Sequence, residues 1–352
     1  MLAWRDRGSR RLGVGCVMMT VAWVAVCGSA GEGAGVGGQD EARLTWSKAS
    51  GLHALMYAYT AYCTEAQVTA WSCRYCGHHG TESFIPMYII ANATHNSFGF
   101  VGYERETGTA IVSFRGTVMT SLKNWISDLV SAEMVPLPGT GVYVGEGFLH
   151  AWLSVRAQVH IAVRSVMDTH SPQRILVTGH SLGAALATLA VLDIKAAVGN
   201  VPVNVITFGD PRVGDASFAK HYVRTLGTDS TIRVTWKHDL VPHLPPEALG
   251  FVHVPTEVWG HVPEGSRNVN YTVCDGSGED PYCSDSVAFP ASVFDHLHYM
   301  GIYENGCIDV SGGSTSGSSG TSSSSTSGGA DGEIVGGGRG RVPVVDRRSE
   351  MW

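Results

Sequence analysis

The sequence predicts an α/β fold in which a mostly parallel sheet is covered by helices on both faces. Three observations predict it. Apolar strand-like runs alternate with helical stretches along the chain, which is typical of a parallel sheet with crossover helices. The apolar run 175–178 leads directly into a glycine-containing turn at 179–183, and an alanine-rich helical stretch follows it. The 352 residues are 44% hydrophobic, which is enough for one core of about 260 residues with flanking segments.

The expected elements of the first half are a helix, a hairpin and a second helix. Residues 44–63 carry apolar side chains at helical spacing, which predicts an amphipathic helix. Two short apolar runs at 98–103 and 109–114 are joined by a polar, glycine-ended turn, which predicts an antiparallel hairpin. One long helix is expected from Gly147 to Met167, because its apolar residues fall on a single face.

The second half continues the alternation. Val203–Phe208 and Thr231–Trp236 are expected to be buried strands, and Ala216–Leu226 is expected to be the helix between them. The fold is expected to end near Cys307.

Composition divides the chain into four segments. Residues 1–30 predict a signal peptide: a basic start with four arginines, an apolar stretch too short for the roughly 20 residues of a membrane span, and small residues at its end. A flexible glycine-rich segment is expected at 31–43 and the globular domain at 44–310. Residues 311–352 begin as an almost pure Ser/Gly/Thr run, which predicts a disordered tail.

The net charge of −7 with scattered cations does not indicate a nucleic-acid partner. The cysteines beyond residue 30 form an even set suited to disulfides in an exported protein. An alternative reading is a zinc site at Cys73 and Cys76 with His78 and His79, but the histidines follow too closely for ordinary ligand spacing. Sequons at Asn92 and Asn270 predict glycosylation in a eukaryotic secretory route.

The motif Gly179-His-Ser-Leu-Gly183 predicts a nucleophilic serine. Between a strand and a helix, G-x-S-x-G is typical of a sharp turn that exposes the serine at the carboxyl edge of a parallel sheet. A serine hydroxyl is a weak nucleophile, so Ser181 requires a histidine base and an acid that orients it.

Residue reasoning alone leaves the acid and the base open. Asp239 follows a predicted strand and is favoured over Asp210, which lies in a Pro/Gly turn. His296 is favoured as the base because it lies near the end of the fold. The other histidines that follow the serine are His238, His243, His253, His261 and His298.

From about residue 44 to 308 the chain resembles the fungal-type class 3 lipases, which are secreted triacylglycerol lipases of α/β-hydrolase fold. The matching segments are Phe114-Arg-Gly-Thr117, Lys123-Asn-Trp-Ile-Ser-Asp-Leu129, Gly147-Phe-Leu149, Thr178-Gly-His-Ser-Leu-Gly183, Pro211-Arg-Val-Gly-Asp215, Asp239-Leu-Val-Pro-His-Leu-Pro-Pro246 and Ser292-Val-Phe-Asp-His-Leu-His-Tyr299. The resemblance implies that Ser181 is the nucleophile, Asp239 the acid and His296 the base. It also implies the disulfides Cys63–Cys307, Cys73–Cys76 and Cys274–Cys283.

An oxyanion hole and a lid are expected as well. The Leu182 backbone N–H is one expected donor, and Thr117 resembles the family residue that supplies the second. Residues 118–128 are the expected lid, because Leu122, Trp125 and Ile126 form one apolar stripe at helical spacing; the alternative is a fixed core helix. Asp128 either holds the Thr117 hydroxyl or faces solvent. His180 is expected to pack in the pocket.

These expectations together predict a secreted lipase that cleaves acylglycerols through an acyl-enzyme. The alternatives are a phospholipase A1 or feruloyl esterase of the same fold, or a catalytically inactive lipid-binding module. We expect no cofactor and no metal. The expected partner is a lipid ester at an oil–water interface, contacted only peripherally by a monomer.

Overall fold

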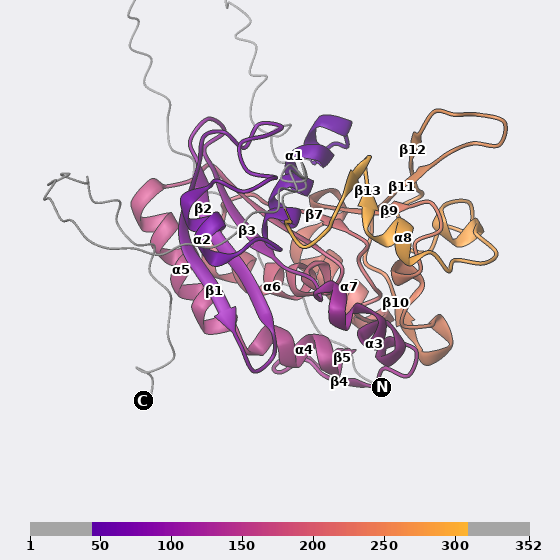
Figure 1. The fold of residues 1–352 in the computed structure, drawn as a ribbon. Helices are drawn as coiled ribbons and strands as arrows, with labels where there is room; N and C mark the ends of the chain where they lie inside the picture. Colours follow the sequence, from indigo (N-terminus) through magenta and orange to yellow (C-terminus); the bar gives the residue numbers. More distant parts are fainter. Residues whose placement is uncertain (1–43, 309–352) are drawn as a thin grey trace, which may run out of the picture. The chain divides into compact units, whose positions relative to one another are not determined.

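The computed structural model describes residues 44–308 (Figure 1). The expected signal peptide at 1–30, the glycine-rich start at 31–43 and the tail at 311–352 lie outside the described residues, as do the last two residues of the expected domain. Within 44–308, no helix is both long and apolar enough to cross a membrane.

The main sheet of the described chain has eight strands in the order β1-β2-β3-β6-β7-β9-β11-β12. The pairs from β3 to β11 are parallel, and the pairs outside them are antiparallel. The prediction of a mostly parallel sheet is therefore confirmed. The strands are β1 (Phe84–Asn92), β2 (Ser97–Glu104), β3 (Thr109–Phe114), β6 (Arg174–His180), β7 (Val203–Phe208), β9 (Thr231–Trp236), β11 (Glu257–His261) and β12 (Asn270–Val273).

Short strands complete the described sheets. A four-stranded sheet has the order β10-β8-β5-β4, and β13 pairs with β14 in a hairpin. Their bounds are β4 (Met134–Pro136), β5 (Tyr143–Gly145), β8 (Gly214–Asp215), β10 (Phe251–Val252), β13 (His298–Tyr299) and β14 (Ile302–Tyr303).

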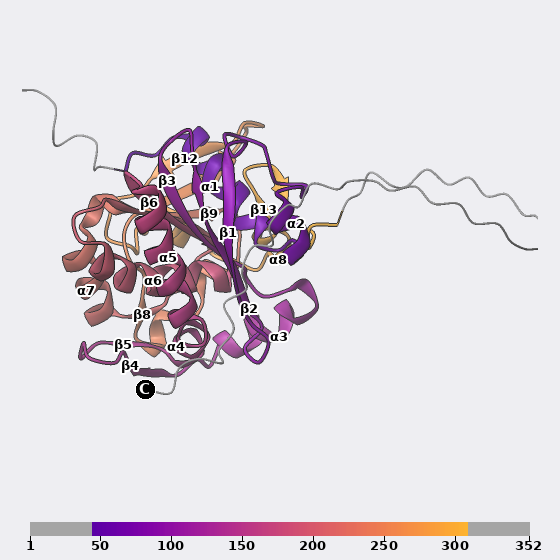
Figure 2. The same ribbon diagram turned by 90° about the vertical axis from the view of Figure 1, so that its left-hand side faces the viewer.

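Helices cover both faces of the main sheet. Neighbouring residues of a strand point to opposite faces of the sheet, so they pack against different helices. Val177 of β6 belongs to the buried cluster formed with α4, α5, α6 and α7, whereas Leu176 belongs to the cluster formed with α1. Figure 2 shows α5, α6 and α7 on one side of the strands. The helices are α1 (Lys48–Thr60), α2 (Glu65–Ala70), α3 (Met119–Leu129), α4 (Glu146–Leu153), α5 (Arg156–His170), α6 (Leu182–Val198), α7 (Ala216–Leu226) and α8 (Val293–His296), with 3₁₀ turns at Thr228–Ser230, Val241–His243, Glu247–Leu249 and Ser284–Ser286.

Two helix predictions are corrected. The helix expected to be amphipathic, α1, is buried continuously from Ala54 to Thr60. It packs against other segments of the chain as well as against the sheet. The single helix expected from Gly147 to Met167 is two helices. The break falls at Ser154 and Val155, where the Ser154 hydroxyl donates to the Ala151 carbonyl at 2.7 Å and α4 ends.

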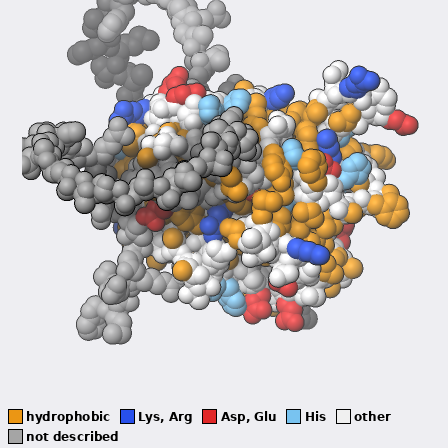
Figure 3. Space-filling view, in the orientation of Figure 1, with side chains coloured by type: hydrophobic (Ala, Val, Ile, Leu, Met, Phe, Trp, Pro, Cys, Tyr) orange, Lys and Arg blue, Asp and Glu red, His pale blue; other side chains and the backbone are white. Residues whose placement is uncertain are grey.

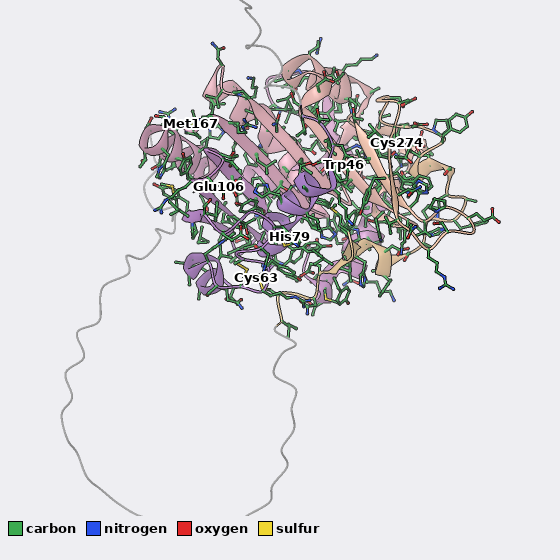
Figure 4. All side chains as sticks on the ribbon, turned by 90° about the horizontal axis from the view of Figure 1, so that it is seen from above. Trp46, Cys63, His79, Glu106, Met167 and Cys274 are labelled. Atoms are coloured by element: carbon green, nitrogen blue, oxygen red, sulfur yellow. A yellow bond between two sulfur atoms is a disulfide. The ribbon has the colours of Figure 1, made fainter. Side chains whose placement is uncertain are left out.

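Three disulfides connect loops around the sheet: Cys63–Cys307, Cys73–Cys76 and Cys274–Cys283. Figure 4 labels Cys63 and Cys274, which belong to two of these disulfides. The Cys63–Cys307 bond joins the segment after α1 to the segment after β14, across a sequence separation of 244 residues. It therefore joins the two ends of the described fold.

Candidate active site

Ser181 lies in a sharp turn between β6 and α6. Its backbone has φ 61° and ψ −130°, a left-handed conformation that ordinary residues avoid. The turn closes because the flanking residues are glycines: a Cβ on Gly179 would lie 2.2 Å from the Gly183 carbonyl oxygen, and one on Gly183 would lie 2.2 Å from that of Phe114. The geometry is that of a nucleophile elbow, as the motif predicts.

Asp239 and His296 are paired at the same edge of the sheet. Asp239 follows β9, and His296 ends α8. His296 Nδ1 lies 3.1 Å from Asp239 Oδ1 and 3.0 Å from Oδ2, and both residues are buried. Because a carboxylate only accepts, Nδ1 carries the proton and Nε2 keeps its lone pair. The imidazole is thereby held in the tautomer of a general base.

The Asp239–His296 pair and Ser181 both lie near the end of β7. The Ser181 N–H donates to the Phe208 carbonyl at 3.0 Å. At the next residue, a Cβ on Gly209 would lie 2.9 Å from His296 Cε1 and 3.1 Å from Asp239 Oδ2. Ser181 Oγ and His296 Nε2 are both buried without a hydrogen-bond partner among the described residues. The serine hydroxyl and the lone pair of the base are thus left available for chemistry in one small volume.

Two backbone hydrogen bonds fix the carboxylate and its loop. The Val241 N–H donates to Asp239 Oδ1 at 2.8 Å. Ser292, at the start of α8, donates its N–H to the His238 carbonyl at 3.0 Å, and it forms a parallel bridge with Asp239. The loop that carries the base is therefore attached to the loop that carries the acid.

Thr117 and Leu182 flank the serine. The Leu182 N–H begins α6, so it has no partner within the helix and lies at the positive end of its dipole. Thr117 follows Gly116, where a Cβ would lie 2.8 Å from Ser181 Cβ. The Thr117 hydroxyl oxygen is buried without a hydrogen-bond partner in the described chain. Both expected oxyanion donors therefore lie beside the serine.

A sequence model of the family described as lipase (class 3) matches residues 111–249. The lipase of Rhizomucor miehei is 32% identical over 251 residues, covering 70% of this chain and 67% of that protein. The chain belongs to the class 3 lipase family. The lipase of Rhizopus niveus is 32% identical over 255 residues, covering 71% of this chain but only 63% of the relative, less than two thirds of its length.

A solved structure described as "a serine protease triad forms the catalytic centre of a triacylglycerol lipase" resembles this class 3 lipase with a TM-score of 0.66 at 30% identity. The match covers 76% of this chain and 99% of that chain. The predicted fold class, an α/β-hydrolase fold, is confirmed by this likeness together with the parallel sheet.

Two tyrosines that sequence reasoning missed bond Asp239 and His180 of this class 3 lipase. The Tyr299 hydroxyl donates to Asp239 Oδ2 at 2.5 Å, and burial beside that carboxylate raises the pKa of Tyr299 well above its usual value. The Tyr62 hydroxyl lies 2.8 Å from His180 Nδ1. Neither tyrosine has a local sequence pattern; only the proximity of Tyr299 to the expected base could have indicated it.

His180 is buried in the pocket beside the base. Its Nε2 lies 2.8 Å from the His296 carbonyl oxygen, and the two rings are 4.5 Å apart between centroids. Burial and the neighbouring His296 hold the pKa of His180 well below its usual value, so the ring is neutral. A carbonyl only accepts, so Nε2 donates to it and Nδ1 accepts from Tyr62.

Asp210, the alternative acid, is directed away from the base. Its Oδ2 accepts hydrogen bonds from Thr188 at 2.9 Å and Thr207 at 3.1 Å, beneath α6. Burial raises the pKa of Asp210 to about 6. Among the other histidines, His253 is buried with Nε2 2.7 Å from the Pro242 carbonyl, and His238 is mostly exposed.

Of the two readings of Asp128, the structure has the one in which it faces solvent and does not hold the Thr117 hydroxyl. Asp128 is solvent-exposed, and the Thr117 hydroxyl oxygen has no hydrogen-bond partner within residues 44–308. Asp128 is two residues beyond Ile126, which on a helix turns its side chain about 200° away from the buried stripe. Its alternative reading, a carboxylate facing solvent, is the one the structure has.

The apolar stripe of α3 is directed inward. Leu122 is 4% exposed and Ile126 8% exposed, and both pack in the cluster that contains Phe114. Trp125 is partly buried against the same cluster, while Lys123 and Asn124 face solvent. Ser181 itself is fully buried. Ser181 is therefore not accessible to solvent in this structure.

The remaining expected sites have these surroundings. Cys73 and Cys76 are joined to each other, so the alternative zinc site lacks its thiolates. At the first sequon, the Asn92 amide nitrogen donates to the Ser154 carbonyl at 3.1 Å, so the atom that a glycan would use is engaged. Asn270 is exposed on β12.

Proposed function

We propose that this chain is a secreted serine esterase that hydrolyses acylglycerols. The observation that carries the proposal is the buried Asp239–His296 pair near the end of β7, where the Ser181 N–H is also bound. His296 Nε2 and the Ser181 hydroxyl have no hydrogen-bond partner within residues 44–308. This is the arrangement in which histidine can take a serine proton.

The reaction proceeds in two steps, formation and hydrolysis of an acyl-enzyme. His296 Nε2 takes the Ser181 proton while Oγ attacks the ester carbonyl, and the carbonyl oxygen becomes an oxyanion. The N–H of Leu182 and the N–H and hydroxyl of Thr117 stabilise that charge. His296 then gives its proton to the departing alcohol, leaving an acyl-enzyme. Water, deprotonated by His296, then attacks the acyl carbon. The bond from the acyl carbon to Ser181 Oγ breaks, His296 returns its proton to Oγ, and the fatty acid is released.

We propose that α3 is a lid over an acyl groove. The first residue before the helix, Val118, offers no side-chain cap, so the helix start is weakly fixed. Its inner stripe, Leu122 and Ile126, would become exposed on opening and would then favour a lipid surface over water.

An apolar surface beside the base supports contact with a lipid phase. Phe289 is 86% exposed and Phe294 66% exposed, on the chain that leads into His296. Figure 3 shows a broad gathering of apolar side chains on the face that carries α8. Aromatic side chains at such exposure are costly in water and stable at the boundary of a lipid phase.

Secretion is proposed from the disulfides and the leader-like start. Three disulfides within 44–308 suit an oxidising compartment. We propose a monomer that contacts lipid peripherally.

The rival substrates are phospholipids and feruloyl esters. The apolar side chains of α3 favour long acyl chains over a feruloyl ester. A feruloyl esterase would be better served by a flap of polar residues. Phospholipid is the closer rival, because it carries the same acyl chains and differs only in its headgroup.

The test is hydrolysis of short- and long-chain triglycerides, a phosphatidylcholine and methyl ferulate, each below and above its solubility limit. We expect the highest rate on emulsified triglyceride, with a jump in rate when the emulsion forms. Ser181→Ala should lose on the order of 10⁶-fold in kcat. Best turnover on dissolved ferulate would overturn the substrate assignment, and unchanged activity of Ser181→Ala would overturn the mechanism.

A further inference from the structure

We propose that Glu304 is a positioning residue for the reaction: a buried carboxylate, attached through its backbone to the residue after His296, that stabilises the protonated form of His296 during turnover. The proposal rests on the proposed function, because it assigns Glu304 a role toward the base of that mechanism.

Glu304 is an acidic side chain in an unusual place. It is 0% exposed, in the segment between β14 and the Cys307 disulfide. Its Oε1 accepts a hydrogen bond from the Gly306 N–H at 2.6 Å. Its Oε2 is buried without a hydrogen-bond partner among the described residues. Burying a carboxyl with one oxygen that lacks a hydrogen-bond partner within residues 44–308 costs folding free energy, so its presence calls for a functional explanation.

The backbone connects Glu304 to the base. Its N–H donates to the carbonyl of Leu297, the residue directly after His296, at 2.9 Å. The hairpin of β13 and β14 closes the chain between them. Main-chain hydrogen bonding therefore holds the backbone of Glu304 next to that of the residue that follows His296.

Ionisable groups surround Glu304 on the packed elements. Its charge interacts with His296 and Arg74. Burial first, and the charge of Glu304 second, raise the pKa values of the neighbouring tyrosines, which stay protonated. Burial raises the pKa of Glu304 itself to about 7, against opposing effects of the Gly306 N–H and His296. The groups are Tyr59 and Tyr62 from α1 and its end, Arg74 and Tyr75 from the Cys73–Cys76 loop, and His296 from α8.

The direction of the effect follows from charge. When His296 accepts the Ser181 proton it becomes a cation in a dry site, and a nearby anion lowers the free energy of that cation. Asp239 supplies one anion by direct contact. Glu304 supplies a second at longer range, but only where it is ionised. Turnover should therefore rise with pH through the ionisation of Glu304 as well as through that of the base.

The experiment replaces the charge and keeps the shape. Glu304→Gln retains an oxygen for the Gly306 N–H, and Glu304→Asp retains the charge. The matched control is Glu104→Gln: Glu104 is also 0% exposed, and its carboxylate is held by His53, Tyr57 and Thr107, away from the base. Hydrolysis of a dissolved short-chain nitrophenyl ester is measured from pH 5 to 10, so that no lipid surface affects the pH response.

For Glu304→Gln we expect kcat at pH 9 to fall about three- to tenfold with KM unchanged, and the acid limb of the profile to move to lower pH by about half a unit to one unit. Glu304→Asp should recover part of the lost kcat, and Glu104→Gln should keep the wild-type profile. A wild-type profile in Glu304→Gln would overturn the proposal, as would an equal effect in Glu104→Gln.

A measurement on the unaltered protein covers the case in which Glu304→Gln fails to fold. The ring resonances of His296 should show two inflections with pH, one of which coincides with titration of the Glu304 side-chain carboxyl carbon. A single inflection would overturn the proposal. Loss of activity in Ser181→Ala tests the proposed function independently, so the esterase assignment can stand while the role of Glu304 falls.

Discussion

Asp239 accepts the Nδ1 proton of His296 through both carboxylate oxygens, at 3.1 and 3.0 Å. An amide at this position would present an NH₂ group or a single oxygen and would favour the wrong imidazole tautomer. We expect Asp239→Asn to lower kcat about 10⁴-fold with little change in fold. Asp210→Asn is the matched control and should retain activity within about threefold, since within residues 44–308 the Asp210 carboxyl is hydrogen-bonded to Thr188 and Thr207 and not to His296. Equal losses in the two variants would contradict the pairing.

Thr117, which follows Gly116 beside the serine, carries a buried hydroxyl with no hydrogen-bond partner in the described part of the chain. Thr117→Val has nearly the same shape and removes only that donor. We expect kcat to fall about 10²–10³-fold while the unfolding temperature stays close to that of the parent. Thr117→Ser, which keeps the hydroxyl, should retain most activity. Steady-state kinetics on a dissolved ester decides; wild-type kcat in Thr117→Val would remove the hydroxyl from the mechanism.

Tyr299 donates its hydroxyl to Asp239 at 2.5 Å inside the core. Tyr299→Phe leaves one carboxylate oxygen short of a donor, so we expect about tenfold lower kcat and a loss of about 1–3 kcal/mol in unfolding free energy. Tyr303→Phe, in the adjacent strand of the same hairpin, is the control. Urea titration and kinetics of both variants check this; indistinguishable behaviour would count against a role for Tyr299.

Two buried carboxyls make stability depend on pH. Burial raises the pKa of Glu304 to about 7 and that of Asp210 to about 6. The folded state keeps these protons where the unfolded state has released them, so stability falls as pH rises through each folded pKa. Glu304→Gln should be more stable than the parent at pH 8, by up to about 3 kcal/mol, and should differ least near pH 4. Urea unfolding at both pH values measures it. A gain of the same size at pH 4 would point to packing instead of ionisation.

The Cys63–Cys307 disulfide spans 244 residues, whereas Cys274–Cys283 spans 9. Because a cross-link restricts the unfolded chain more when its loop is longer, replacing the first pair by alanine should cost about 2–5 kcal/mol. Replacing Cys274 and Cys283 should cost about 3 kcal/mol less, on the same loop-entropy argument. Thermal unfolding of the two double variants gives the comparison. Equal losses would show that loop length does not set the effect.

Local patterns predicted the elements that local sterics determine. The strands Val203–Phe208 and Thr231–Trp236 and the helix Ala216–Leu226 have the predicted bounds, because apolar runs end at polar or glycine residues there. The elbow at Ser181 followed from the two glycines that permit the approach of Gly179 to Gly183. These features depend on neighbours in sequence.

Contacts between distant segments were not predictable in the same way. Tyr62 and His180 meet across 118 residues, and Tyr299 reaches Asp239 across 60. Nothing near either tyrosine distinguishes its hydroxyl from that of a surface residue. The break at Ser154 was missed because the apolar periodicity continues through it while the hydroxyl bonds back to Ala151. Residue reasoning likewise left Asp239 and Asp210 as rivals until the fold separated them.

The main-chain bridge between Ser292 and Asp239 has a consequence for diversification of this scaffold. Because this bridge holds the two ends of the 240–291 stretch together, the loop 262–269 between β11 and β12 can change length without altering the spacing of acid and base. Val241, which donates to Asp239, and β11, which pairs with β9, have to be kept. Exchange of that loop among relatives is thus a practical route to new selectivity.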